Sequence, residues 1–230
     1  MSDADFTVHL VDDDRDVRRA LSRALLARGM PVQDHASAEA FLAAYDPARP
    51  ACLILDYGLP GMSGLDLQAE IARREDILPI IFITGHGGVA EAVRAMRGGA
   101  IDFLEKPFRQ AALMERIDTA RSTALRLRAA RDHQAAIAQR FARLTEREAE
   151  IVRQIFAHPA ETSSKELARR LDISPRTVDH HRARILEKLN VASVSGLFGL
   201  VAELSGPGPL DQLIGTAAQA TPGQGQGESA

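Results

Sequence analysis

The sequence predicts an α/β domain with a doubly wound, five-stranded parallel sheet, followed by a small all-α domain. The first half of the 230-residue chain alternates five short apolar runs with segments of helical periodicity. This order is typical of a parallel sheet that is covered by helices on both faces. The later part shows only helical patterns, and the stretch 126–140 between the two parts is basic whereas residues 1–125 are acidic overall.

The first two strands are predicted at residues 6–11 and 31–35. Three Asp residues follow the first strand, and apolar residues then recur at helical spacing up to Gly29, a natural helix C-cap. Ser37 is placed to cap a helix after the second strand. The pattern is strand, carboxylate cluster, helix, strand and helix.

The other three strands are predicted at residues 52–56, 78–83 and 101–104. Helices are expected at 65–74 and 89–97. The run 52–56 is apolar until its last residue, as in a strand buried on both faces of a sheet.

Polar residues follow the ends of four of these strands. In an open parallel sheet such ends meet at one edge, where ligands bind. The residues expected to converge there are Asp12, Asp13, Asp56, Thr84 and Lys106. Clustered carboxylates bind a hard cation such as Mg²⁺, and an Asp can carry a phosphoryl group whose charge a metal, a hydroxyl and an ammonium stabilise. The structural alternatives are a turn at Asp56 and helix capping by Asp12 to Asp14.

These residues resemble the receiver domain of response regulators. The matching motifs are Asp12-Asp13, Asp56-x-x-x-Pro60-x-x-x-Gly64, Thr84-Gly85 and Phe103-x-x-Lys106-Pro107-Phe108. The resemblance implies a flavodoxin-like fold with Asp56 as phosphoacceptor. It also implies an Mg²⁺ cofactor bound by Asp13, Asp56 and the backbone carbonyl of Gly58, with Asp12 acting mainly through water.

The same resemblance implies a switch. Thr84 and Lys106 would hold the phosphoryl oxygens, and the bond before Pro107 would be cis. The added negative charge would draw the Thr84 hydroxyl inward and leave space that Phe103 fills. Because Phe103 has no hydroxyl, it would report the change through packing alone.

The second domain is predicted to contain a helix-turn-helix. Thr145 and Glu148 form a capping box at the start of its first helix. A short helix at 164–171, a three-residue turn and a helix that begins at Pro175 follow, and the last of these would enter the major groove of DNA. A fourth helix is expected at 193–204. The residues expected on the DNA-facing side are Ser174, Arg176, Thr177, Asp179, His180, Arg182, Arg184 and Lys188. The alternative for them is a polar, solvated face.

This segment resembles the LuxR-type output domain, and the whole chain resembles the NarL/FixJ family, nearest to its FixJ branch. The matching stretches are Leu144-Thr145-x-Arg147-Glu148, Lys165-Glu166-Leu167-Ala168, Ile173-Ser174-Pro175-Arg176-Thr177-Val178-x-x-His181 and Lys188-Leu189-Asn190-Val191. The resemblance implies that Asp179 and His180 read bases. It places Arg176, Thr177, Arg182 and Lys188 nearer the phosphates.

Four segments are expected: a receiver domain at 1–122, a helical linker at 123–140, a helix-turn-helix domain at 141–204 and a disordered tail at 205–230. In the last helix of the first domain, apolar residues from Leu113 to Leu127 step by four and three. This spacing fits a short coiled coil between two chains, and it fits equally a helix packed on its own sheet.

We expect a phosphorylation-activated DNA-binding transcriptional regulator of a two-component system, and not an enzyme. Its expected partners are a sensor histidine kinase, promoter half-sites in double-stranded DNA, RNA polymerase and, once phosphorylated, a second copy of the chain. The acidic N-terminus and the short apolar runs favour a cytoplasmic protein without a membrane segment. The alternatives are a phosphoryl-accepting module that titrates a partner protein and a metal-dependent phosphohydrolase, which is disfavoured because no second substrate pocket is evident.

Overall fold

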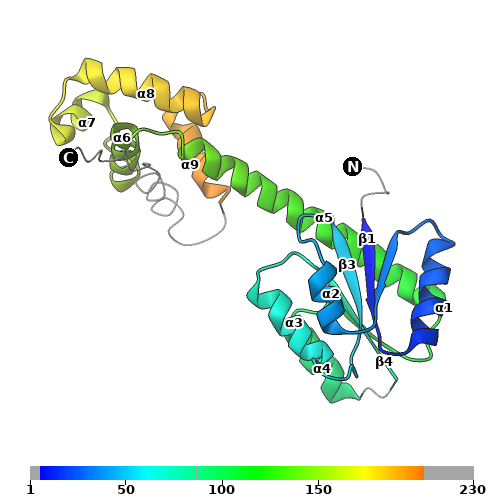
Figure 1. Ribbon diagram of the computed structural model, residues 1–230. Coiled ribbons are helices and arrows are strands. Elements are labelled where there is room, and N and C mark those ends of the chain that lie inside the picture. The colour runs from blue at the N-terminus through cyan, green and yellow to red at the C-terminus, as the bar shows by residue number, and fades with distance from the viewer. Residues whose placement is uncertain (1–5, 86–87, 205–230) are drawn as a thin grey trace, which may run out of the picture. The chain divides into compact units, whose positions relative to one another are not determined.

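The computed structural model describes residues 6–85 and 88–204 of the chain, so the predicted tail at 205–230 lies outside the described residues. The chain divides into two compact units, Met1–Ala130 and Arg131–Ala230 (Figure 1). The division lies inside the segment that the sequence predicts as a linker.

The first unit is built on a five-stranded parallel sheet. Its strand order is β2-β1-β3-β4-β5. The strands are β1 (Thr7–Val11), β2 (Val32–His35), β3 (Ala51–Asp56), β4 (Ile80–Thr84) and β5 (Asp102–Glu105). The chain winds outward in one direction from β1 to β2 and in the other from β3 to β5. The predicted doubly wound sheet is therefore confirmed, and its switch point lies between β1 and β3.

Helices cover both faces of this sheet (Figure 1). They are α1 (Arg15–Leu26), α2 (Ala38–Ala44), α3 (Gly64–Arg73), α4 (Val89–Arg97) and the first part of α5 (Gln110–Phe141). Leu25 of α1 and Ile117 of α5 share one apolar cluster with Leu10 and Ile54 of the sheet. A second cluster joins α2, α3 and α4 to the opposite face of the same strands. This two-sided burial explains why the central strands are apolar throughout.

A pair of imidazoles, His9 buried and His35 half-buried, lies beside this apolar core. His9 in β1 is 5% exposed, and its Nδ1 lies 3.2 Å from Nε2 of His35 in β2. Phe41 and Tyr45 pack edge-on against the His9 ring. Burial and the neighbouring His35 lower the pKa of His9 to about 4, and burial also lowers the pKa of His35.

We expect the first unit to lose stability as the pH falls from 6.5 towards 4. In that range His9 takes up a proton in the unfolded chain but not in the folded one, so protons favour unfolding. The difference in pKa corresponds to a loss of about 3 kcal/mol from this residue. Urea unfolding of the chain at pH 7.5 and pH 4.5 measures the loss, and His9→Phe should reduce it. If the His9→Phe chain loses as much stability over this pH range, the pH dependence comes from other groups.

The apolar residues of α5 that fit a coiled coil pack within their own unit. Leu113, Ile117, Ala120 and Ala124 are buried in the cluster on the α1 face of the sheet, whereas Leu127 is 43% exposed. Of the two alternatives for this helix, packing on its own sheet is the one found. The predicted linker is the later part of α5, and it is helical throughout.

The second unit is a small all-α domain with one core. It comprises the end of α5, α6 (Glu146–Ala157), α7 (Ser164–Leu171), α8 (Pro175–Leu189) and α9 (Val194–Ala202). Ile137 and Phe141 of α5 lie in the core with residues of all four following helices. The helix-turn-helix is present: α7 ends at Asp172 in the left-handed conformation, and Ser174 caps α8 with Pro175 at its first position.

One helical stretch among the described residues, Pro175–Ala202, is long and apolar enough to cross a membrane by length and composition. It is not one continuous helix, because Asn190 ends α8 in the left-handed conformation and Ser193 caps α9. Its apolar residues Leu189, Leu197 and Leu200 are buried in the core of the second unit. Core packing therefore accounts for part of the apolar composition, since 22% of the apolar window is buried.

Candidate functional site

Three charged residues meet at the carboxyl edge of the sheet. Asp12 follows β1, Asp56 ends β3 and Lys106 follows β5. The Lys106 ammonium donates hydrogen bonds to Asp12 Oδ2 at 2.7 Å and to Asp56 Oδ1 at 2.8 Å. These residues are far apart in the chain, and the crossovers of the fold bring them to one point, as the sequence predicts.

The other predicted residues of this edge lie beside that group. Asp13 is exposed in the turn after β1, and Thr84 is buried at the end of β4. The Thr84 carbonyl accepts a hydrogen bond from the Lys106 backbone N–H at 2.7 Å. Phe103 of β5 is half-buried and contacts the Tyr57 ring edge-on, and the Lys106-Pro107 bond is cis as expected.

Backbone geometry around Asp56 keeps its carboxylate in place. The Gly58 N–H donates to Asp56 Oδ2 at 2.8 Å, which leaves Oδ1 for Lys106. Gly64 begins α3 directly against this strand end, where a Cβ atom would lie 2.7 Å from the Asp56 carbonyl and 2.9 Å from the Phe82 ring. Only glycine allows α3 to start so close to the end of β3.

The three Asp residues after β1 have different partners. Asp14 accepts hydrogen bonds from the backbone of Asp16 and Val17, so it is the cap of α1. Asp12 accepts one from the Asp14 N–H at 2.9 Å and points its other oxygen at Lys106. Helix capping therefore accounts for Asp14 and leaves the other two carboxylates to the edge of the sheet.

Burial controls the charges in this group. Asp12 is only 1% exposed, and desolvation raises its pKa above the usual range although the Lys106 hydrogen bond opposes the shift. Burial works against the charged form of Lys106, but its hydrogen bonds to Asp12 and Asp56 outweigh burial and raise its pKa. Lys106 therefore stays positively charged at neutral pH.

The donor set at this edge fits Mg²⁺. Asp12, Asp13, Asp56 and the Gly58 carbonyl offer only oxygen, and Mg²⁺ takes one or two carboxylates while keeping several waters and a substrate phosphate. In residues 6–85 and 88–204, no group of three or more His, Cys, Asp and Glu side chains is gathered closely enough to form a metal site from protein donors alone.

The second candidate site is the outer face of α8. Five of the predicted residues are exposed along the first part of this helix: Arg176, Thr177, Asp179, His180 and Arg184. Ser174 is exposed just before it, and its hydroxyl accepts from the Thr177 N–H at 3.1 Å as the helix cap. Ser174 therefore stabilises the start of α8 whether or not it contacts DNA.

Two predicted residues of α8 do not point freely outward. Lys188 donates to Glu148 Oε2 at 2.5 Å, and Glu148 is buried at the start of α6. Arg182 donates to the Thr162 carbonyl and the Ser164 hydroxyl, both at 3.2 Å. Lys188 and Arg182 are half-buried and already have partners within the unit, so a contact of either residue with DNA stays a prediction.

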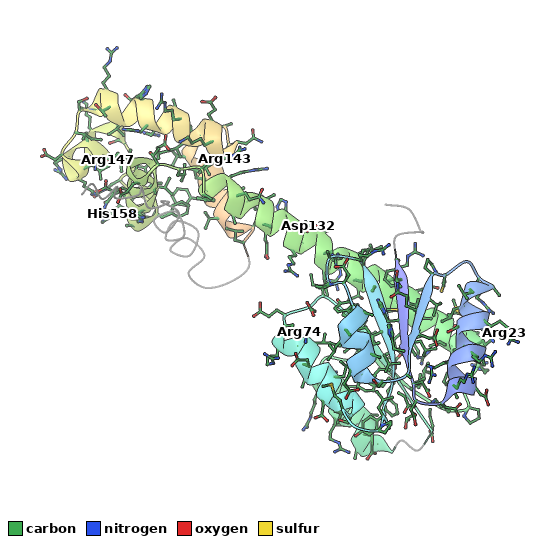
Figure 2. The ribbon with its side chains drawn as sticks, in the orientation of Figure 1. Arg23, Arg74, Asp132, Arg143, Arg147 and His158 are labelled. Carbon is green, nitrogen blue, oxygen red and sulfur yellow. The ribbon has the colours of Figure 1, made fainter. Side chains whose placement is uncertain are left out.

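Residues outside the predicted set hold the two helices of the helix-turn-helix. Arg147, labelled in Figure 2, donates to the Leu171 carbonyl at the end of α7 at 2.7 Å. Its neighbour Glu148 holds Lys188 near the end of α8. Ser164 donates to the exposed carboxylate of Asp179. A capping box in the sequence predicts where a helix starts, but it does not indicate which distant groups its polar residues bind.

Comparison with known families matches each of the two units to a separate family. Residues 8–118 match the family described as the response regulator receiver domain. Residues 142–200 match the family described as bacterial regulatory proteins of the luxR family.

Individual relatives match nearly the whole chain. The transcriptional regulatory protein FixJ of Rhizobium meliloti is 40% identical over 193 residues, which are 84% of this chain and 93% of that protein. The response regulator protein TmoT of Ectopseudomonas mendocina is 37% identical over 89% of this chain and 91% of its own length. Among solved structures, the response regulator StyR superposes with a TM-score of 0.78 at 39% identity, over 87% of this chain and 100% of that one.

Proposed function

Because the chain belongs to the two-component response regulators that join a receiver domain to a LuxR-type DNA-binding domain, we propose that Asp56 accepts a phosphoryl group from a sensor histidine kinase. Transfer to Asp56 then controls how α8 and its neighbours bind promoter DNA. In this role the chain is a transcriptional regulator and not an enzyme.

One observation carries the proposal. The Lys106 ammonium lies within hydrogen-bond distance of both Asp56 and the buried Asp12. A phosphoryl group on Asp56 Oδ1 would arrive beside this cation, which can then pair with a phosphoryl oxygen in place of the carboxylate. The positive charge needed to stabilise the transferred group is therefore already in position before the reaction.

The other residues of the edge have distinct parts in the proposal. Asp13, Asp56 and the Gly58 carbonyl hold Mg²⁺, with Asp12 acting mainly through water. When bound, Mg²⁺ neutralises charge on the phosphoryl oxygens during transfer. The Thr84 hydroxyl turns towards a phosphoryl oxygen, and Phe103 moves into the space that the hydroxyl leaves. Pro107 ends β5 and holds the turn that carries Lys106.

We propose that phosphorylation leads to a homodimer that binds paired half-sites in DNA. Val89, Val93 and Met96 are exposed on α4, next to β5 of the switch, and exposed apolar residues of this kind are typical of an interaction surface. The contacts to DNA come from Ser174, Arg176, Thr177, Asp179, His180 and Arg184 of the α8 region, with Arg182 and Lys188 at its border. If each chain neutralises about three phosphates, the affinity of the dimer falls with salt at a log slope of about −5.

The proposed function is that of an intracellular signalling protein. We propose a cytoplasmic location, RNA polymerase as a further partner, and domains at 1–122 and 141–204 joined by the helical segment 123–140. The match of residues 8–118 and 142–200 to two separate families supports these boundaries.

The proposal is tested by phosphorylation with a small phosphodonor. The full chain, incubated with acetyl phosphate and Mg²⁺, should gain one phosphoryl group in its intact mass, and the gain should vanish on removal of Mg²⁺ by a chelator. Asp56→Asn should gain none, and Glu70→Gln, which changes a half-buried carboxylate of α3 that pairs with Arg73 and Arg74, should behave as the unaltered chain. Phosphorylation of Asp56→Asn to the same extent would reject Asp56 as the acceptor.

A further inference from the structure

Arg18 links the carboxylate turn to the rest of the first unit. It lies in the second turn of α1, and its side chain is only 13% exposed. Its Nη1 donates to the Asp12 carbonyl at 2.7 Å and to the Asp13 carbonyl at 3.0 Å. Its Nε lies 3.5 Å from Asp34 Oδ2 at the end of β2. One guanidinium therefore joins α1, β2 and the turn after β1.

The two carbonyl groups that Arg18 holds belong to the peptide units on either side of Asp13. Together these units define the backbone torsions of Asp13, so Arg18 fixes the direction in which its side chain leaves the chain. Asp12 has other restraints, because Lys106 and the Asp14 N–H hold its carboxylate. Asp13 is exposed, and among the described residues no hydrogen bond to its carboxylate is found. The orientation of the Asp13 side chain therefore depends on the backbone alone.

We propose that Arg18 is a positioning residue that orients Asp13 towards a divalent cation at the edge of the sheet. This inference rests on the proposed role of that edge as a Mg²⁺ site. Hydrogen bonds to a metal-ligating residue raise metal affinity by fixing its orientation, and their loss typically weakens binding by about 10- to 100-fold.

If Arg18 acted through its charge alone, its effect on Mg²⁺ affinity would be the opposite. A guanidinium near a cation site repels the cation, so an Arg18 that acted only through its charge would weaken Mg²⁺ binding, and its removal would strengthen it. Asp34 offsets part of this repulsion by pairing with the same guanidinium. The direction of the change in Mg²⁺ affinity therefore separates positioning from simple electrostatics.

The experiment measures Mg²⁺ binding to the full chain by tyrosine fluorescence. The sequence has no Trp and two Tyr, and Tyr57 is adjacent to Asp56. We expect Arg18→Gln to weaken Mg²⁺ binding by about tenfold. Arg18→Lys should lie between Arg18→Gln and the unaltered chain, because a single ammonium can reach one of the two carbonyls. Arg19→Gln, the matched loss of an exposed arginine on the same helix, should bind Mg²⁺ unchanged.

Unfolding in chelator shows that each variant is folded before the titration. Asp14 still caps α1 in all of them, so Arg18→Gln should unfold cooperatively, and Arg18→Lys provides the comparison if it does not. Unchanged or tighter Mg²⁺ binding by Arg18→Gln or Arg18→Lys would overturn the inference and leave the proposed function intact. Absence of Mg²⁺ binding in the unaltered chain would instead overturn the metal site itself, and the inference with it.

Discussion

A Lys106→Met variant is expected to lose about 3 kcal/mol of receiver stability in metal-free buffer at pH 7. Met fills the space of the Lys stem but removes the ammonium that pairs with Asp12 and Asp56. Asp12 is then a buried carboxylate without its cation, beside a second carboxylate. If the edge binds Mg²⁺ as proposed, the added cation supplies positive charge near the same carboxylates, so it should return part of the lost stability.

The measurement is urea unfolding followed by tyrosine fluorescence, with chelator and with Mg²⁺. Both tyrosines, Tyr45 and Tyr57, lie in the receiver domain, so the signal reports that domain alone. Arg74→Met is the control: it breaks an exposed ion pair with Glu70 and should change stability by less than about 1 kcal/mol. A similar loss in both variants, or a loss that Mg²⁺ leaves unchanged, would contradict the proposed charge balance between Lys106 and the two carboxylates.

The pH dependence of the Lys106→Met loss has a definite sign. Burial already raises the folded pKa of Asp12 above its unfolded value, and removal of Lys106 raises it further. A proton then binds the folded state more tightly than the unfolded one, so acid stabilises the variant relative to the unaltered chain. The deficit should shrink as the pH falls through the folded pKa of Asp12.

The second large effect is expected in the DNA-binding domain. Lys188→Met should destabilise this domain by about 3 kcal/mol, because Glu148 would remain buried without its cation. The double variant Glu148→Gln with Lys188→Met should recover most of the loss. The introduced amide oxygen would still accept from the Thr145 N–H, as the Glu148 carboxylate does at 2.8 Å, and the amide carries no charge. Calorimetric unfolding of the full chain measures the unaltered protein and both variants.

The same double variant tests whether Lys188 contacts DNA. A phosphate contact contributes about 0.9 to the slope of log affinity against log salt concentration. If the contact to Glu148 persists in the complex, the double variant should bind a defined duplex with the slope of the unaltered chain. Arg184→Gln, which removes an exposed cation from the same helix, should lower the slope by about 0.9. A lower slope in the double variant would show that Lys188 contacts a phosphate.

Sequence patterns were sufficient to predict the fold and the convergence of polar residues at the carboxyl edge of the sheet. In a doubly wound sheet the strand ends share one edge, so Asp12, Asp56 and Lys106 are brought together by topology alone. The same holds for the helix-turn-helix, whose capping residues Thr145 and Ser174 mark helix starts in the sequence.

Contacts between distant side chains were not predictable in this way. Helical periodicity shows that Lys188 lies on a polar side of α8, but it does not reveal that buried Glu148 lies opposite. Periodicity is likewise the same for a coiled-coil seam and for a helix packed on its own sheet, so α5 remained ambiguous until its burial was known. Arg18 gave no signal, because its partners are two backbone carbonyls and the carboxylate of Asp34 on a different strand.

DNA binding distinguishes a regulator from a module that only titrates a partner protein. A titrating module would accept a phosphoryl group at Asp56 in the same way, and would bind a duplex no more tightly afterwards. The exposed arginines Arg176 and Arg184 on α8 favour the regulator, since exposed guanidinium groups on a recognition helix are suited to phosphates and guanine.

The most direct test is the affinity of the full chain for a duplex selected from random sequence, with and without beryllium fluoride in the presence of Mg²⁺. We expect this phosphoryl mimic to tighten binding by about tenfold or more, because a dimer engages two half-sites at once, and we expect no such change in Asp56→Asn. Equal affinity with and without the mimic, or tightening that persists in Asp56→Asn, would contradict control of DNA binding through Asp56.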